Sequence, residues 1–202
     1  MSADPLVLAT RNQGKLHELA RILGTQIRLV GLDEFPGAPD VPETGATFEA
    51  NALLKARAIA TYTKLPAVAD DSGLCVDALN GMPGVLSARW AGQHGDDRAN
   101  LDLVLAQVAD VPNARLGARF VCAAALVIPA DGIPGEWVVT GQVEGRLVRV
   151  PRGSEGFGYD PIFQPDGFQE TTAEMTPDAK DAISHRGRAF RALAPFIIGG
   201  LT

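Results

Sequence analysis

The stretch LPAVADDSG, residues 65–73, runs from a short apolar segment directly into two acids, Asp70 and Asp71. The apolar segment predicts a buried β-strand that ends at Asp70, followed by a turn at the Ser-Gly pair. Open α/β sheets bind their ligands beyond the carboxyl ends of their strands. The stretch therefore predicts two acids at a ligand-binding edge of an α/β sheet.

The two adjacent carboxylates need compensation. They repel each other, and burial raises the free-energy cost of keeping both ionised. A hard divalent cation or a shared proton relieves that cost, and the position at the strand end favours the cation. The alternative is that Asp71 and Ser72 only start a turn, as Asp-Ser-Gly sequences often do. The segment by itself leaves both interpretations open.

Outward from this stretch, helical and strand patterns alternate. Apolar or alternating runs predict further strands at 5–9, 26–30, 120–128 and 137–148. Helical spacing of apolar residues predicts helices at 16–23, 48–59, 98–108 and about 176–196. Helices alternate with strands in the first part of the chain, and a β-hairpin follows in the later part, so the predicted fold class is α/β with a mixed sheet. No repeat or linker divides the chain, so residues 1–202 are expected to form a single domain.

Composition excludes several classes of protein. The chain has 202 residues, 46% of them hydrophobic, and a net charge of −6. This charge argues against nucleic acid or an anionic membrane as the main partner, although local cations can still attract a small anion. Cys75 and Cys122 lie in apolar runs and do not suggest a disulfide framework. With no visible secretory signal and no membrane-spanning run, we expect a cytoplasmic protein.

Residues 10–15, Thr10-Arg11-Asn12-Gln13-Gly14-Lys15, lie between an expected strand and an expected helix. The unpaired N–H groups and the positive dipole end of a helix start favour an anion. Gly14 allows a phosphate to approach the backbone, and Lys15 adds a charge. The spacing is not that of a Walker loop. An ordinary turn with an exposed lysine is the alternative.

The segment from Ser184 to Arg188, SHRGR, opens the last expected helix, with Ser184 as its N-cap. Cations are disfavoured at a helix start, so His185 and Arg186 suggest an anion or a ring rich in acceptors in front of them. Lys180 can reach the same space. The alternative is a solvated basic helix face.

Two further segments complete the candidate residues. Phe157 lies between glycines in GFGYDP (156–161), which predicts either a ring exposed for stacking on a base or an anchor tucked into the core. Glu43 can join a metal-binding group, and Lys55 can neutralise carboxylates or bind phosphate. Together, the cations, acids and aromatic ring match the anionic tail and flat base of a nucleoside polyphosphate.

The segments that carry these residues resemble the inosine/xanthosine triphosphate pyrophosphatase family. The resemblance covers nearly the whole chain, through LATRNQGKLHEL (8–19), ETGATFEANALLKA (43–56), PAVADDSGLCVDALNGMPGVLSARWAG (66–92), GFGYDPIF (156–163) and AEMTPDAKDAISHRGRA (173–189). It implies an elongated mixed β-sheet with flanking helices and two lobes around a central nucleotide-binding cleft, usually in a homodimer. The implied activity is Mg²⁺-dependent hydrolysis of ITP, dITP and XTP to the monophosphate and pyrophosphate.

The resemblance also implies individual roles. Asp71 would be the metal-linked catalytic base, helped by Asp70, with Glu43 as a further metal ligand and Lys55 in support. The substrate contacts would be Thr10, Arg11, Asn12, Gln13, Gly14, Lys15, Ser72, Phe157, Gly158, Tyr159, Asp160, Lys180, His185 and Arg186. The chain departs from the family pattern where Pro42 precedes Glu43 and where Ala50 replaces an acid. Two alternatives remain: a pyrimidine-directed pyrophosphatase of related fold, and a non-catalytic nucleotide-binding protein.

Overall fold

The computed structural model describes residues 5–11, 13–23, 27–129 and 135–201. The strands are β1 (Leu6–Leu8), β2 (Leu29–Val30), β3 (Ala67–Val76), β4 (Gly117–Ile128), β5 (Gly135–Leu147) and β6 (Phe163–Pro165). The helices are α1 (Gln13–Leu23), α2 (Phe48–Thr63), α3 (Asp97–Gln107), α4 (Pro177–Ile183) and α5 (His185–Leu201). In the described part of the chain, no helix combines the length and hydrophobicity needed to cross a bilayer.

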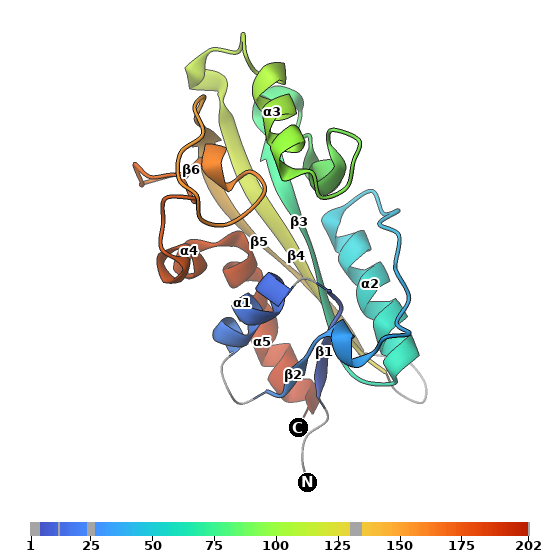
Figure 1. The fold of residues 1–202 in the computed structure, drawn as a ribbon. Helices are drawn as coiled ribbons and strands as arrows, with labels where there is room; N and C mark the ends of the chain where they lie inside the picture. Colours follow the sequence, from blue (N-terminus) through green and yellow to red (C-terminus); the bar gives the residue numbers. More distant parts are fainter. Residues whose placement is uncertain (1–4, 12, 24–26, 130–134, 202) are drawn as a thin grey trace. The chain divides into compact units, whose positions relative to one another are not determined.

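The strands form one six-stranded sheet in the order β2-β1-β3-β4-β5-β6 (Figure 1). β1 pairs in parallel with both β2 and β3, whereas β5 and β6 are antiparallel. The sheet is therefore mixed, and the prediction of an α/β fold with a mixed sheet is confirmed.

β3 differs from its prediction. It does not end at Asp70 but continues to Val76, and it lies between β1 and β4, so both acids sit in the interior of a central strand. The strand can continue because Gly73 has no side chain: a Cβ there would overlap the hydroxyl of Ser87 and the carbonyl of Gly84. Ser87 instead accepts a hydrogen bond from the Leu74 amide at 3.0 Å.

The carboxyl-terminal helix also differs from its prediction. Instead of one helix over about 176–196, α4 and α5 are separated by Ser184, whose backbone is extended. Ser184 does directly precede α5, the position predicted for an N-cap. The expected second strand is shorter than 26–30, because β2 holds only Leu29–Val30, and Gln26 lies outside the described residues.

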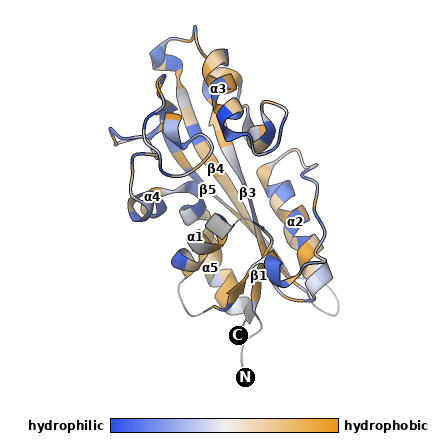
Figure 2. Ribbon diagram, viewed as in Figure 1, coloured by the Kyte–Doolittle hydropathy of each residue, from blue (hydrophilic) through white to orange (hydrophobic). Residues whose placement is uncertain are grey.

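Contacts between Cα atoms divide the chain into two compact units. The first unit consists of Met1–Asp71, Cys122–Gly141 and Arg186–Thr202. In its core, α1 and α5 cover the face of the sheet that carries Leu8, Val68 and Ala124. α2 buries the predicted stripe, and Figure 2 shows hydrophobic and hydrophilic residues alternating along α2 and α5. The members of that stripe are Phe48, Ala52, Ala56 and Ile59.

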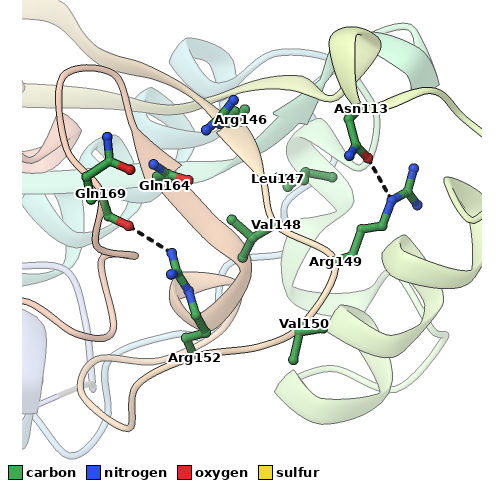
Figure 3. Close-up of a pocket in the computed structure, with 9 residues that line it drawn as sticks. All are labelled: Asn113, Arg146, Leu147, Val148, Arg149, Val150, Arg152, Gln164 and Gln169. Atoms are coloured by element: carbon green, nitrogen blue, oxygen red, sulfur yellow. Dashed lines mark hydrogen bonds between the residues drawn. The ribbon is translucent and has the colours of Figure 1, made fainter.

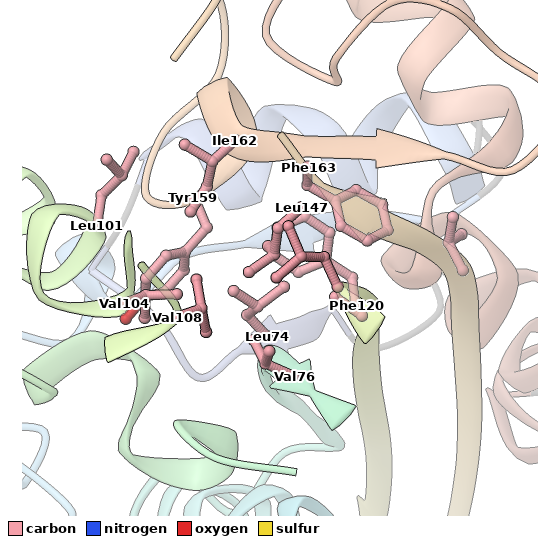
Figure 4. Packing of buried hydrophobic residues seen from close by; sticks show 13 residues of the cluster. Leu74, Val76, Leu101, Val104, Val108, Phe120, Leu147, Tyr159, Ile162 and Phe163 are labelled. Atoms are coloured by element: carbon pink, nitrogen blue, oxygen red, sulfur yellow. The ribbon is translucent and has the colours of Figure 1, made fainter. Parts of the chain in front are cut away.

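The second unit consists of Ser72–Val121 and Gln142–His185. Its core joins β3, β4 and β5 to α3, and Figure 4 shows this cluster of side chains. The rings of Phe120 and Phe163 pack edge to face, with centroids 4.6 Å apart. The single domain and the two lobes around a cleft stay predictions.

A cavity in the core of the first unit should lower the stability of the fold. Leu193 on α5 is completely buried, so Leu193→Ala is expected to lower the free energy of unfolding by about 2–5 kcal/mol. Arg191→Ala on the exposed side of the same helix should change it by less than about 0.5 kcal/mol. Urea unfolding measures both, and equal effects of the two variants would contradict the assigned core.

Candidate functional site

Asp70 and Asp71 point to opposite faces of β3. Side chains alternate along a strand, so Asp70 shares a face with Val68, which packs against α1 and α5. Asp70 accordingly meets Lys15 of α1 and Arg186 of α5, while Asp71 meets Asn51 and Lys55 of α2. The prediction that the two acids emerge together at a strand end is therefore wrong.

Asp70 is the centre of a buried ion cluster in the first unit. Lys15 Nζ lies 3.1 Å from Asp70 Oδ1 and 3.0 Å from Oδ2, and Arg186 Nε lies 3.3 Å from Oδ2. The side chains of Asp70 and Arg186 are only 2% and 5% exposed. Burial by itself raises the pKa of Asp70, but attraction to Lys15, Arg186 and Lys55 outweighs it and holds the pKa well below its usual range.

Asp71 has a different environment. Asn51 Nδ2 donates to Asp71 Oδ2 at 2.9 Å, and Lys55 Nζ lies 3.8 Å from Asp71 Oδ1. Lys55 also donates to Glu43 Oε1 at 2.8 Å. Burial, together with the charges of Glu43 and Asp70, raises the pKa of Asp71 despite the opposing effects of Lys55 and Asn51. Asp71 is thus a carboxylate prepared to accept a proton more readily than an ordinary aspartate.

Asn51 was not singled out in the sequence. It is completely buried, and its Oδ1 accepts a hydrogen bond from the Gly45 amide at 2.7 Å while its Nδ2 donates to Asp71. Asn51 therefore links the loop that follows Glu43 to the Asp71 carboxylate. The sequence did contain a pattern that could have identified Asn51: it follows Phe48 by three residues, which puts a polar side chain on the buried face of α2.

Oxygen donors around Asp71 suit a hard divalent cation. Asp71 and Glu43 both lie beside the Lys55 ammonium, and carboxylates are the protein ligands that Mg²⁺ prefers. Among the described residues, no group of three or more His, Cys, Asp or Glu side chains is arranged to hold a metal ion. Mg²⁺ commonly takes one or two carboxylates and completes its shell with water and substrate phosphates. Asp71 and Glu43 fit that pattern, whereas Asp70 is already bound to two cations.

A second group of candidate residues lies in the second unit around Asp160. This buried carboxylate accepts hydrogen bonds from the Phe157 amide at 2.8 Å, from Thr172 Oγ1 at 2.7 Å and from Lys180 Nζ at 2.6 Å. Phe157 is 51% exposed, which fits a stacking surface and not the core anchor that the sequence also allowed. Lys180 Nζ lies 5.4 Å from the centroid of its ring. Asp160 therefore holds the aromatic loop and the lysine together.

The neighbouring loop residues have structural partners. Tyr159 is buried, its hydroxyl donates to the Ser87 carbonyl at 2.8 Å, and burial raises its pKa. The Gly158 amide donates to Asp97 Oδ2 at 2.8 Å, so the first residue of α3, which the sequence did not single out, holds the loop tip. The ring of His185 stacks on Phe120, with centroids 4.9 Å apart. His185, Lys180 and Asp160 line one small cavity.

The segment 10–15 leads into α1, which begins at Gln13, earlier than the helix predicted over 16–23, so Gly14 and Lys15 lie in its first turn. Arg11 donates to the Ala38 carbonyl at 2.9 Å and pairs with Asp40 at 3.4 Å, so it contacts the loop that follows β2. Asn12 and the side chain of Gln13 lie outside the described residues. Thr10 is half-buried beside β1, and Ser72 continues β3 in the second unit.

The fold and these groups define an α/β protein whose central strand carries two buried carboxylates with separate sets of cationic partners. The family model described as the Ham1 family matches residues 6–196, and the chain belongs to this family. It is 62% identical over 195 residues to a Streptomyces coelicolor protein named dITP/XTP pyrophosphatase, an alignment that covers 95% of this chain and 96% of that protein.

Solved structures agree with the assignment. A nucleoside-triphosphatase / dITP/XTP pyrophosphatase from Mycobacterium abscessus is 56% identical with a TM-score of 0.78, covering 95% of this chain and 99% of that one. A HAM1 protein from Coxiella burnetii is 42% identical with a TM-score of 0.87, covering 96% and 98%. Both chains are thus similar to this one over almost their full length.

The Asp70 cluster predicts a pH-dependent loss of stability. Asp70→Asn should lower the free energy of unfolding at pH 7 by about 3–5 kcal/mol, because Lys15 and Arg186 lose their buried counter-charge. Since the folded pKa is depressed, the carboxylate stabilises the protein above its unfolded pKa of about 3.9, and this contribution is lost as the pH falls. The difference between wild type and variant should therefore shrink from about pH 5 to pH 2 in urea unfolding.

The matched control is Asp102→Asn, which removes an exposed carboxylate paired with Arg98 and should have little effect. A difference between Asp70→Asn and wild type that stays constant with pH would contradict the depressed pKa.

Proposed function

We propose that this protein hydrolyses the purine nucleoside triphosphates ITP, dITP and XTP between the α- and β-phosphates, removing them from the nucleotide pool. The observation that carries the proposal is the Asp71 carboxyl, which is buried beside Lys55 and has a raised pKa. Relatives of the chain named dITP/XTP pyrophosphatase support the same activity. Water and the triphosphate give the nucleoside monophosphate and pyrophosphate.

Asp71 is the proposed base. It takes a proton from the attacking water, the water oxygen forms a bond to the α-phosphorus, and the bond from that phosphorus to the bridging oxygen breaks. Burial raises the pKa of the Asp71 carboxyl, which favours uptake of the proton, whereas Mg²⁺ bound to the same carboxyl would lower that pKa. Asn51 holds the carboxylate in a single orientation while this happens.

Cations of the first unit are the proposed partners of the phosphates. Lys15 lies in the first turn of α1, where unpaired backbone amides add to its charge. Lys55 is partly exposed and its pKa is raised: burial opposes the shift, but Asp70, Asp71 and Glu43 stabilise its charged form. These groups can stabilise the negative charge that develops on the leaving pyrophosphate.

Asp71 and Glu43 are the residues that we propose to hold Mg²⁺. When bound, the ion supplies charge neutralisation at the phosphate oxygens. The orientation of Asp71 by Asn51 and of Glu43 by Lys55 keeps both carboxylates in place for this role. Asp70 is better assigned to positioning Lys15 and Arg186, since both cations contact it directly.

The second unit supplies the proposed base-binding residues. The exposed ring of Phe157 offers a stacking surface for a purine, with Lys180 beside it and His185 held by its stack on Phe120. Hypoxanthine and xanthine carry an acceptor oxygen at position 6 and a donor at N1, whereas adenine reverses both. A site that donates a hydrogen bond to position 6 leaves the amino group of adenine facing another donor. Each such unpaired polar group costs about 1–3 kcal/mol of binding free energy when it is buried.

Two rivals of different kinds are tested by the same assay. A pyrimidine-directed pyrophosphatase shares phosphate-binding features but not the preference for purines, and a nucleotide-binding protein without catalysis releases no pyrophosphate. Asp71 with its raised pKa supports an enzyme over a binding protein. The homodimer and the cytoplasmic location stay predictions.

A panel of nucleoside triphosphates tests the substrate class. With Mg²⁺ present, we expect ITP, dITP and XTP to be cleaved with a kcat/KM at least about 100-fold above that of ATP, from two mismatched polar groups. Pyrophosphate release measures the rate, and chromatography identifies the monophosphate product. Equal efficiency on ATP, or faster cleavage of pyrimidine nucleotides, would overturn the assignment.

Asp71→Asn tests the proposed base. The variant should lose at least about 100-fold in kcat, because the amide cannot accept the proton from water. It should remain folded, since a carboxyl with a raised pKa does not stabilise the fold through its charge at neutral pH. Asp102→Asn, the exposed control, should keep full activity. A folded Asp71→Asn protein with near-normal turnover would refute the role.

A further inference from the structure

A hollow of about 430 Å³ opens on the second unit, beside the end of β5 and the segment that follows it (Figure 3). Three arginines line it at regular intervals, Arg146, Arg149 and Arg152, together with the amide side chains of Gln164 and Gln169. None of these five residues belongs to the groups around Asp71 or Asp160. The hollow is within the size range of small-molecule binding sites in proteins.

Two of the three guanidinium groups are held in place by hydrogen bonds. Arg149 Nε donates to Asn113 Oδ1 at 2.8 Å, and its terminal nitrogens donate to the carbonyls at 108, 109 and 111, just beyond α3. Arg152 donates to the Gln169 carbonyl at 2.9 Å, and its Nε lies 3.5 Å from Glu174. Figure 3 shows Arg149 turned toward Asn113 and Arg152 toward Gln169. These contacts fix the walls of the hollow.

Arg146 is different. It is exposed, and among the described residues its guanidinium makes neither a hydrogen bond nor an ion pair, so its five N–H donors remain available. Its backbone pairs with Gln164 across β5 and β6, and paired residues in a sheet share a face, so the Gln164 side chain lies beside it. Arg146, whose side chain is free to move, thus lines the same hollow as Arg149 and Arg152, whose side chains are already oriented.

The charge of the hollow is opposite to that of the chain. The protein carries a net charge of −6, yet among the residues that the structure describes no Asp or Glu lines the hollow. Glu174 offsets part of the charge of Arg152, and the carbonyls after α3 offset part of that of Arg149, which leaves Arg146 as the strongest uncompensated charge. Planar guanidinium groups bind phosphate oxygens in a bidentate manner, which a lysine cannot do.

We propose that this hollow binds the phosphates of a di- or triphosphate anion, as a site separate from the catalytic carboxylates. Arg146 would close on the phosphate oxygens, Arg152 would add its remaining donors, and the side-chain amide of Gln169 would offer a further contact. Gln164 lines the hollow but is buried, and its Nε2 already donates to the Phe168 carbonyl at 2.6 Å. The same chemistry is present in free pyrophosphate and in the tail of a nucleoside triphosphate. The site lets an anion of this class bind the enzyme without occupying the residues around Asp71.

Binding without turnover tests the proposal. ¹⁵N-labelled full-length protein is titrated with sodium pyrophosphate in the presence of EDTA, and separately with ITP in EDTA, while amide chemical shifts are recorded. We expect the backbone amides of 146–152 and the side-chain amides of Gln164 and Gln169 to shift. Shifts with pyrophosphate identify the free anion as sufficient, and shifts with ITP alone identify the nucleotide tail.

Arg146→Gln should weaken the apparent affinity reported by these amides about tenfold, because one charged, bidentate partner is lost. Arg98→Gln removes another exposed arginine, from α3 outside the hollow, and should leave the affinity unchanged. Neither variant touches a proposed catalytic residue, so kcat on ITP at low pyrophosphate should stay at the wild-type value in both. The proposal is overturned if neither anion shifts these amides, or if Arg146→Gln binds as tightly as wild type.

Discussion

The buried contact of Asp70 with Lys15 and Arg186 is the interaction on which the first unit depends. It joins β3 to α1 and α5 through residues 55 and 116 positions apart in the chain. The two cations offset the free-energy cost of burying the Asp70 carboxylate, and the carboxylate in turn offsets the cost of burying the Arg186 guanidinium. Because the side chains of Asp70 and Arg186 are nearly removed from water, loss of the Asp70 carboxylate removes a buried counter-charge from both cations. The cluster therefore fixes the geometry of the strand that also carries Asp71.

This arrangement separates the roles of two neighbouring aspartates. Asp70 is held ionised by its cations, whereas burial raises the pKa of Asp71 and leaves it able to take up a proton. Two carboxyl groups whose environments move their pKa values in opposite directions are typical of sites that need one fixed charge and one reactive group. The alternation of side chains along β3 is the physical cause, since it sends each carboxylate to a different helix layer.

Local patterns predicted much of the framework. The stripe of α2, from Phe48 to Ile59, is buried as its helical spacing indicated, and the uniformly apolar run 120–128 does lie in a central strand. The glycines around Phe157 left an exposed ring and a core anchor both open, and the structure shows that the residue is exposed. By contrast, the end of β3 was misplaced, because an Asp-Ser-Gly sequence resembles a turn unless the tertiary structure supplies Ser87 as a neighbour for the strand.

The sequence by itself determined the α/β class, the buried faces of the helices and strands, and which polar residues are suited to catalysis or binding. These features depend on local periodicity and composition. Only the tertiary structure decided which of them meet. It gave Asp70 its two cations, gave Asp71 its asparagine and lysine, and brought Lys180 to Asp160 across 20 positions of the chain. The physical reason is that a charge or hydrogen bond acts over a few ångströms in space, whatever the separation along the chain.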